Sequence, residues 1–306
     1  MKFGTFSTIL NYNEYSYLKF DHVEKQNVVL KLTYENIKHN GEIELNHFLN
    51  KESKYLCKIY KDSITKVILT PFIYTYLKQS LDKYDEDRIC KLLRYSRFNS
   101  YFIENLGEFD VFDKIDDIIV YNKNIWDSDK KIILFIQHMC KTLEYLKSNS
   151  VCHFDIKPEN IMYNEVIPEF GLRFKLIDFG FAEKYPFNNY RNKIIGTKYY
   201  VPKYYSNLEY PEWHTKIECN DWIYDNNTLK HCVIINKLDY GLIYKTDIFS
   251  LGMVFIHLLY YLKQVYKETD YSIYESLTVN MTHYDLVKRY SYTDCLIFLN
   301  KINNFE

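Results

Sequence analysis

Residues 151 to 160, VCHFDIKPEN, bring together four side chains that can take part in catalysis: His153, Asp155, Lys157 and Asn160. The segment follows an apolar run with helical spacing, so a tight loop here would let these side chains converge on one point. Transfer of a phosphoryl group requires a carboxylate to orient the hydroxyl nucleophile, a cation for the developing charge and an oxygen ligand for magnesium. Asp155, Lys157 and Asn160 have the chemistry for these three tasks. A polar turn with a satisfied histidine is the alternative interpretation.

A second carboxylate follows in the stretch KLIDFGFAEK, where Asp178 stands after an apolar strand-like run and before Gly180. An aspartate at the end of a strand, followed by glycine, can project its carboxylate while the chain turns sharply away. The three letters DFG are a weak signal alone. Their position behind Asn160, with room for one β-hairpin between, favours a second metal ligand.

A small sheet is predicted to precede these motifs. Between residues 1 and 72, short segments rich in Val, Ile and Tyr resemble strands and surround one helix-like piece, GEIELNHFLNK. Helical patterns dominate afterwards, the clearest being SDKKIILFIQHMCKTLEYLKS. The order predicts an α+β fold in one domain, 1–306, with a small β-rich lobe carrying one helix at 1–72 and a larger helical lobe at 73–306. Irregular charged tracts at 82–126 and 203–246 are interpreted as surface insertions.

The composition is that of a globular chain without a large net charge. Its 306 residues are 47% hydrophobic, enough to bury a substantial core, and the formal net charge of −1 excludes the basic footprint of a surface for nucleic acid or anionic membrane. The seven cysteines are scattered and odd in number, and the N-terminal stretch has no secretory pattern. We therefore expect a reducing, intracellular and cytoplasmic setting, or the host cytoplasm or virion for a viral protein.

Two further features of composition bear on class and source. The apolar run 251–262 is well short of the roughly 20 residues of a membrane span and predicts a buried core helix. Tyr, Lys, Asn and Ile are abundant, whereas Ala182 is the single alanine, a bias that indicates an AT-rich genome such as that of a parasite or large DNA virus.

The motifs, in their order, resemble those of the eukaryotic-type protein kinase family. HFDIKPEN is similar to the family's catalytic loop and DFG to its magnesium-binding motif, while VVLK at 28–31 resembles its third-strand lysine motif. DIFSLG at 247–252 resembles the start of the central helix of the large lobe, where Asp247 would brace the catalytic loop backbone. GTKYYVP at 196–202 resembles the substrate-binding end of the activation segment. The resemblance implies the bilobal kinase fold, in a compact form similar to those of large DNA viruses.

By this resemblance, five residues acquire roles in catalysis or metal binding. Asp155 would be the catalytic base, and Lys157 would neutralise the transferred phosphate. Thr197 would tie the substrate platform to Asp155. Asn160 and Asp178 would bind Mg²⁺.

The resemblance also implies a site for ATP. Lys31 would contact the α- and β-phosphates, with its partner glutamate in the helix-like piece that follows. Glu42 is preferred because it shares a face with Leu45 and Leu49, although Glu44, one turn before Phe48, stays open. Met162 and Ile9 would sandwich adenine, and the hinge would lie near Thr70 to Ile73. The expected contacts to ATP are Gly4, Phe6, Ser7, Ile9, Val29, Lys31, Thr70, Phe72, Met162 and Ile177.

The function implied is a serine/threonine protein kinase that uses ATP and Mg²⁺ on protein hydroxyls, without nucleic-acid or membrane partners. Lys157 favours Ser/Thr specificity, because tyrosine-specific members usually have another residue there. The main alternative is a pseudokinase that acts as a binding module. It is favoured by Ser7 at the third glycine position of the phosphate loop and by VPKYY in place of Ala-Pro-Glu, which leaves Arg289 without its usual acid unless Glu209 or Glu212 substitutes.

Two other interpretations are weaker. A small-molecule kinase of the same fold is disfavoured, because GTKYYVP resembles a platform for peptide substrates. A zinc site is disfavoured because its candidate ligands are irregularly spaced: His214, Cys219, His231 and Cys232.

Phe154 stands where the family usually has an arginine that receives a phosphate from the activation loop. We therefore predict that the activity implied by the resemblance does not require such phosphorylation. Incubation with a protein phosphatase, followed by a transfer assay, should leave the activity intact. A large loss after this treatment would contradict the prediction.

Overall fold

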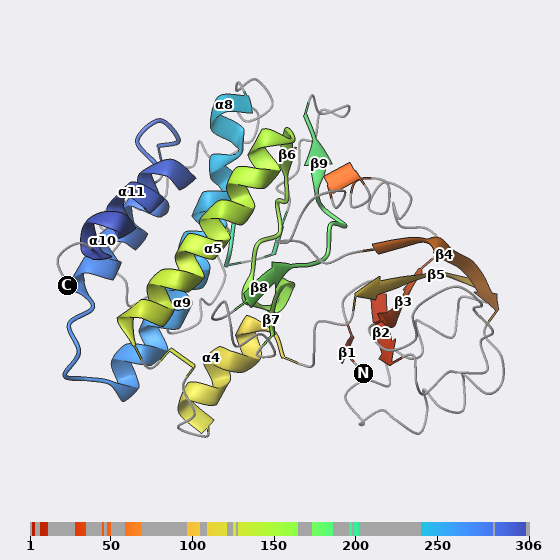
Figure 1. Ribbon diagram of the computed structural model, residues 1–306, viewed down its shortest axis with the longest axis horizontal. Helices are drawn as coiled ribbons and strands as arrows, with labels where there is room; N and C mark the ends of the chain where they lie inside the picture. The colour runs from red at the N-terminus through yellow and green to blue at the C-terminus, as the bar shows by residue number, and fades with distance from the viewer. Residues whose placement is uncertain are drawn as a thin grey trace, which may run out of the picture. The chain divides into compact units, whose positions relative to one another are not determined.

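The computed structural model describes residues 2–3, 7–11, 28–34, 45, 48–49, 59–68, 97–104, 109–120, 125–126, 128–164, 173–185, 196–197, 199–201, 240–283 and 285–303 (Figure 1). The chain divides into two compact units. The first comprises Met1–Ser53 and Cys57–Leu106, and the second comprises Lys54–Leu56 and Gly107–Glu306.

The first unit contains a five-stranded antiparallel sheet with the strand order β1-β2-β3-β5-β4. Its strands are β1 (Lys2–Phe3), β2 (Ser7–Asn11), β3 (Val28–Tyr34), β4 (Ile59–Ile68) and β5 (Arg97–Glu104). Many of their residues are β-branched or aromatic, the types that suit a pleated surface. Leu45, Phe48 and Leu49 have helical backbone, and the Leu49 side chain is buried, in accord with the one helix predicted for this part of the chain.

Strand β5 corrects the predicted layout. It pairs with β3 on one side and β4 on the other, so it lies inside the sheet, whereas the charge pattern of 82–126 predicts a surface insertion. That prediction is wrong for β5 because Asn99 and Ser100 interrupt the apolar pattern of the strand. The first unit consequently extends to Leu106, whereas the predicted lobe boundary stands at residue 72.

The second unit is mainly helical. Its helices are α4 (Val111–Val120), α5 (Asp129–Ser148), α8 (Tyr240–Ile243), α9 (Lys245–Val265), α10 (Ser272–Met281) and α11 (Tyr292–Asn303). Helix α9 packs against α4, α5 and α10, and α11 packs against α5 (Figure 1). Helix α4 begins within the tract 82–126 and buries Val111, Ile115 and Ile118, which is a further correction to the predicted insertion. The tract 203–246 likewise ends in α8 and the start of α9, and its residues 203–239 lie outside the described part of the chain.

The predicted buried helix at 251–262 is confirmed as part of α9, most of whose side chains are buried. By length and composition alone, α9 would also be long and apolar enough to cross a membrane. Since 72% of its most apolar window is buried inside the protein, the helix has the surroundings of a core helix.

Aromatic packing connects α5 to the strands that carry the candidate site. The Trp126 ring stacks on Phe174 of β8 with ring centroids 5.6 Å apart, and Phe135 of α5 meets Phe174 edge-on at 4.6 Å. Rings in such geometries are attracted by more than their buried area. Because Phe174 is fully buried, β8 is held firmly against α5.

Two small antiparallel sheets then bracket the motifs. Strand β6 (Val151–Cys152) pairs with β9 (Glu183–Lys184), and β7 (Ile161–Asn164) pairs with β8 (Arg173–Leu176). The hairpin predicted between Asn160 and Asp178 is therefore confirmed. A short 3-10 helix, η3 (Pro158–Asn160), joins the loop after β6 to β7.

Candidate active site

The loop between β6 and η3 is held by Asp247, in the first turn of α9. One carboxylate oxygen accepts the backbone N–H of His153 at 2.7 Å, and the other accepts that of Phe154 at 2.8 Å. These bonds join residues more than ninety positions apart in the sequence. The predicted bracing of the loop by Asp247 is confirmed.

Burial determines the protonation behaviour of Asp247. Loss of water around the carboxyl group raises its pKa to about 6, the neighbouring charge of Asp155 also raises it, and the two N–H donors from the loop act in the opposite direction. The carboxylate accepts hydrogen bonds from both amides without needing a proton. The two N–H donors therefore stabilise the ionised form of Asp247, whereas burial of the carboxyl group disfavours it.

The His153 ring connects the loop to the segment around Asp178. Its Nε2 lies 3.1 Å from the carbonyl oxygen of Ile177, and its Nδ1 accepts the backbone N–H of Asp155 at 3.3 Å. These partners assign the proton to Nε2, which donates to Ile177. Burial lowers the pKa of His153, although the charges of Asp155 and Asp178 oppose the shift, so a neutral ring fits the site.

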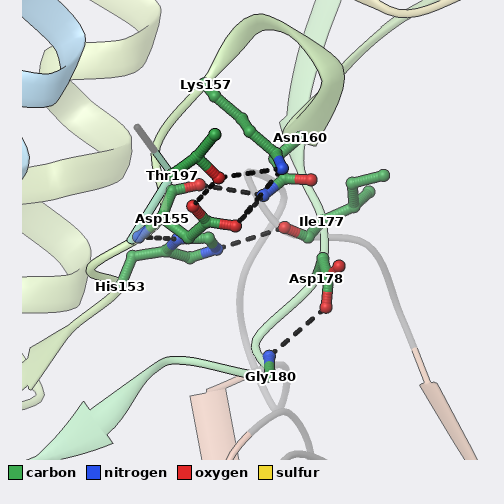
Figure 2. Close-up of polar contacts among 8 residues, drawn as sticks. All are labelled: His153, Asp155, Lys157, Asn160, Ile177, Asp178, Gly180 and Thr197. Carbon is green, nitrogen blue, oxygen red and sulfur yellow. Dashed lines mark hydrogen bonds and ion pairs between the residues drawn. The ribbon is translucent and has the colours of Figure 1, made fainter. Parts of the chain in front are cut away.

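The Asp155 carboxylate is the centre of a polar cluster, and Figure 2 shows Lys157, Asn160 and Thr197 gathered around it. Thr197 donates its hydroxyl to Oδ1 at 2.6 Å, and Asn160 donates its amide to Oδ2 at 3.0 Å and to the Asp155 carbonyl at 2.8 Å. The Lys157 ammonium lies 3.6 Å from Oδ2 and donates to the Thr197 hydroxyl at 3.0 Å. The predicted tie between Thr197 and Asp155 is confirmed as a contact.

The two expected metal ligands lie at the open end of the β7–β8 hairpin. Ile161 pairs with Leu176, and the Ile177 N–H donates to the Asn160 carbonyl at 2.9 Å, so the backbones before β7 and after β8 are adjacent (Figure 2). Asp178 has a left-handed backbone, with φ of 62°, and its Oδ1 accepts the Gly180 N–H at 3.3 Å. This conformation turns the chain directly after the carboxylate.

The donor chemistry of this pair fits magnesium. The Asn160 amide nitrogen is committed to Asp155, so its side-chain carbonyl oxygen is the atom available to a cation. Together with the Asp178 carboxylate, it supplies the oxygen ligands that Mg²⁺ prefers, the remaining positions being filled by water and phosphate. Among the described residues, no group of three or more His, Cys, Asp and Glu is arranged to hold a metal ion.

Gly196 is a site residue whose structural role sequence reasoning missed. Its φ is +118°, and a Cβ added to it would lie 2.4 Å from the carbonyl oxygen of Phe154. Only glycine permits both this backbone and so close an approach. The segment that carries Thr197 therefore comes against the loop because residue 196 has no side chain.

Sequence reasoning also missed Asp110 as a neighbour of the predicted adenine contact, because the resemblance places the hinge near residues 70–73. Asp110 forms an isolated β-bridge with Met162, the residue predicted to contact adenine, and the Tyr163 N–H donates to the Phe109 carbonyl at 3.0 Å. Asp110 and Asp113 exchange backbone-to-carboxylate hydrogen bonds of 3.0 and 2.9 Å at the start of α4. This D-x-x-D pattern is a helix-start signal that the sequence contained.

The other predicted nucleotide contacts belong to the first unit or lie outside the described residues. Ser7 and Ile9 lie on β2, and Val29 and Lys31 on β3, where Lys31 pairs with Ile9 and Tyr101. Outside the described residues are Gly4, Phe6, Glu42, Glu44, Thr70 and Phe72, and also Glu209, Glu212 and the four candidate zinc ligands. The pairing of Lys31 with a glutamate stays a prediction.

Arg289, which was expected to lack its usual acidic partner, is buried beside Lys245, the first residue of α9. Its Nε donates to the His283 carbonyl at 2.7 Å and its Nη1 to the Lys245 carbonyl at 3.0 Å, while the guanidinium lies 4.9 Å from the centre of the Phe249 ring. Backbone carbonyls and an aromatic face thus stabilise this cation.

Comparison with known proteins agrees with this geometry. A model of the protein kinase domain matches residues 77–209, a region that includes the loop, Asp178 and Thr197 and excludes Lys31. Calcium-dependent protein kinase 4 of Plasmodium falciparum is 25% identical over 184 residues, which are 58% of this chain and 34% of that protein. Human myosin light chain kinase 3 is 24% identical over 148 residues, 48% of this chain and 16% of that protein.

A shorter match is closer in sequence. Serine/threonine-protein kinase dkf-1 of Caenorhabditis elegans is 35% identical over 69 residues, 22% of this chain and 9% of that protein. The matches span about a third or less of the length of these relatives. Together, the domain match and the relatives support a eukaryotic-type protein kinase, and a protein kinase domain implies the bilobal kinase fold.

Asp247 gives stability a defined pH dependence. Its folded-state pKa of about 6 exceeds the ordinary value of 3.8, so the folded protein binds this proton more tightly than the unfolded chain. The contribution is fully present below about pH 4 and is lost as the pH rises through about 6. Between pH 4 and 7, the stability advantage of wild type over Asp247→Asn, measured by urea unfolding, should therefore fall by about 2 kcal/mol.

The control is Asp270→Asn. Asp270 is exposed, and hydrogen bonds from Ser272 lower its pKa, so its contribution is lost only as the pH falls below the ordinary value of 3.8. Its stability difference from wild type should stay nearly constant over the same window. A constant difference for Asp247→Asn as well would contradict the assignment of Asp247 as a buried group with a raised pKa.

Proposed function

We propose that this chain is an active serine/threonine protein kinase, which transfers the γ-phosphate of ATP to a hydroxyl of a protein substrate. The observation that carries the proposal is the arrangement around Asp155, whose carboxylate is oriented by Thr197 and Asn160 and lies beside the Lys157 ammonium. A carboxylate fixed in this way is suited to accept a proton from a bound hydroxyl.

In the proposed reaction, the substrate hydroxyl oxygen forms a bond to the γ-phosphorus while the bond between that phosphorus and the β,γ-bridging oxygen breaks. The hydroxyl proton passes to the Asp155 carboxylate, and ADP leaves with the bonding electrons. Asp155 orients the nucleophile, and positioning supplies much of the rate enhancement in reactions of this kind.

Lys157, Asn160 and Asp178 would compensate the negative charge of the phosphates. The Lys157 ammonium, held by the Thr197 hydroxyl, is available to compensate negative charge on the transferred group. Asn160 and Asp178 would hold Mg²⁺, which supplies neutralisation of the phosphate oxygens when bound. In this proposal Lys31 contacts the α- and β-phosphates.

Specificity for Ser and Thr is proposed from Lys157 and from the name of one relative, serine/threonine-protein kinase dkf-1. Protein substrates are proposed from the contact that joins Thr197 to the loop, because the segment 196–202 resembles a peptide platform. The same contact would couple occupancy of the platform to the orientation of Asp155.

A pseudokinase that binds nucleotide or protein without transfer is the second candidate. It is favoured by Ser7, which replaces a glycine of the phosphate loop and lies on β2 opposite Thr33. A serine side chain hinders the close approach of backbone amides to phosphate. The intact set of Asp155, Lys157, Asn160 and Asp178 argues against it, since a binding module has no need of all four.

The direct test is a transfer assay with labelled ATP, Mg²⁺ and a generic Ser/Thr substrate. Wild type should label the substrate. Asp155→Ala should lower the rate by about a thousandfold through loss of the base, and Lys31→Ala should lower it by at least about tenfold through loss of a phosphate contact. The measured quantity is initial rate per folded molecule.

Lys263→Ala is the matched control for Lys31→Ala, because Lys263 is half exposed and its ion pair with Glu275 is remote from the loop. It should retain the wild-type rate. Equal labelling by wild type and both site variants, or none by any of them, would defeat the enzyme proposal. An ATP-dependent rise in melting temperature without transfer would favour the pseudokinase.

A further inference from the structure

Phe154, directly before Asp155, has an unusual backbone. Its φ is +63°, in the left-handed region. This conformation is disfavoured for an L-residue, and for a bulky side chain it marks a genuine outlier. Such a residue persists only where its surroundings determine it. The contacts of Phe154 therefore indicate what holds the loop in shape.

The backbone of Phe154 joins two other segments. Its N–H donates to the Asp247 carboxylate at 2.8 Å, and its carbonyl oxygen lies against Gly196, where a Cβ would come within 2.4 Å. The peptide group after Phe154 leads straight into Asp155. A change in its orientation would therefore move both the carboxylate of Asp155 and the support of the segment that carries Thr197.

The side chain of Phe154 is seated on apolar groups from three elements. It packs against a buried cluster of Cys152 on β6, Ile243 on α8 and Tyr244 before α9, with Tyr292 of α11 beside it. The Tyr244 and Tyr292 rings are 5.9 Å apart, and the Lys147 ammonium lies 4.2 Å from the centre of the Tyr244 ring. The cluster is thus part of the packed helical unit.

We propose that Phe154 is a positioning residue of the site. Its ring, seated on the cluster of Cys152, Ile243 and Tyr244, holds the backbone of residue 154 left-handed and so orients Asp155 and the segment at Gly196. The ring acts through the backbone and does not touch the reacting atoms. The proposal rests on the kinase function proposed above. In it, an apolar side chain keeps this loop ordered.

The substitution Phe154→Gly distinguishes the effect of the ring from the effect of the strained backbone. Phe154→Gly removes the anchor but permits a positive φ without strain, whereas Phe154→Ala removes the anchor and keeps the strain. If the ring is merely tolerated, the glycine variant should equal or exceed wild type. If the ring orients the loop, both variants should lose the orientation, because the backbone hydrogen bond to Asp247 would then have to hold residue 154 without the apolar anchor.

The experiment compares Phe154→Gly, Phe154→Ala and Phe154→Leu with Phe298→Ala. Phe298 is a partly buried phenylalanine of α11 that contacts Tyr290, so its truncation is a matched loss of packing away from the loop. Two quantities are measured: amide hydrogen exchange of the loop at 153–157 and of the segment that begins at Gly196, and kcat and KM for ATP in the transfer assay.

For Phe154→Gly and Phe154→Ala, we expect faster exchange in both segments and a fall in kcat of about ten- to a hundredfold, with KM for ATP within about twofold of wild type. Phe154→Leu should recover most of the rate because it restores an apolar anchor. Phe298→Ala should lower the melting temperature without changing exchange in the two segments.

Unchanged exchange and kcat in Phe154→Gly would overturn the proposal. Should the glycine variant fail to fold, Phe154→Ala and Phe154→Leu decide it, and equal exchange in these two would overturn it as well. A wild-type protein without transfer activity would refute the kinase function, while the exchange data would still show whether the ring orders the loop.

Discussion

The candidate site depends on one buried carboxylate. Asp247 lies in the first turn of the core helix α9 and accepts the backbone N–H groups of His153 and Phe154. A buried charge is costly unless donors surround it, and here the loop itself supplies two of them. The loop amides therefore stabilise the buried carboxylate of the helix, and the carboxylate in turn fixes the backbone of the loop. This mutual requirement explains how a loop with a left-handed phenylalanine can have a defined shape.

The loop that Asp247 holds in turn positions Asp155 and the segment before Asp178. His153 bonds the carbonyl of Ile177, which stands immediately before Asp178, and Asp155 is oriented by side chains that follow it in the loop and by Thr197. The site thus combines α9, the loop, the β7–β8 hairpin and the segment after Gly196. Its polar groups are bonded to one another in a way that leaves carboxylate, ammonium and amide oxygen available for a nucleophile, a phosphate and a cation. Such preorganisation is what the proposed phosphoryl transfer requires.

Sequence reasoning succeeded where function resides in short, local spacing. The loop, the hairpin before Asp178 and the burial of α9 were predicted from motifs of a few residues, whereas the long-range bonds of Asp247 to the loop were predicted from the resemblance to a known family. It failed where long-range pairing decides the structure. Strand β5 contains Asn99 and Ser100, which hide its apolar pattern, and only its pairing with β3 and β4 defines it. The contact of Gly196 with Phe154 and the bridge of Asp110 to Met162 join distant residues and have no local signature.

The most direct test of the central claim is the single-turnover rate of phosphoryl transfer in Asp247→Asn, measured by rapid quench at saturating ATP and Mg²⁺. The amide oxygen of this variant could accept one of the two loop N–H groups, whereas the other N–H group would face the NH2 donor of the side chain. Asp155 should therefore be misplaced without loss of the nucleotide contacts. We expect a rate about a hundredfold below wild type, with ATP affinity changed by less than about threefold. A wild-type rate in this variant would contradict the claim that Asp247 orients the catalytic loop.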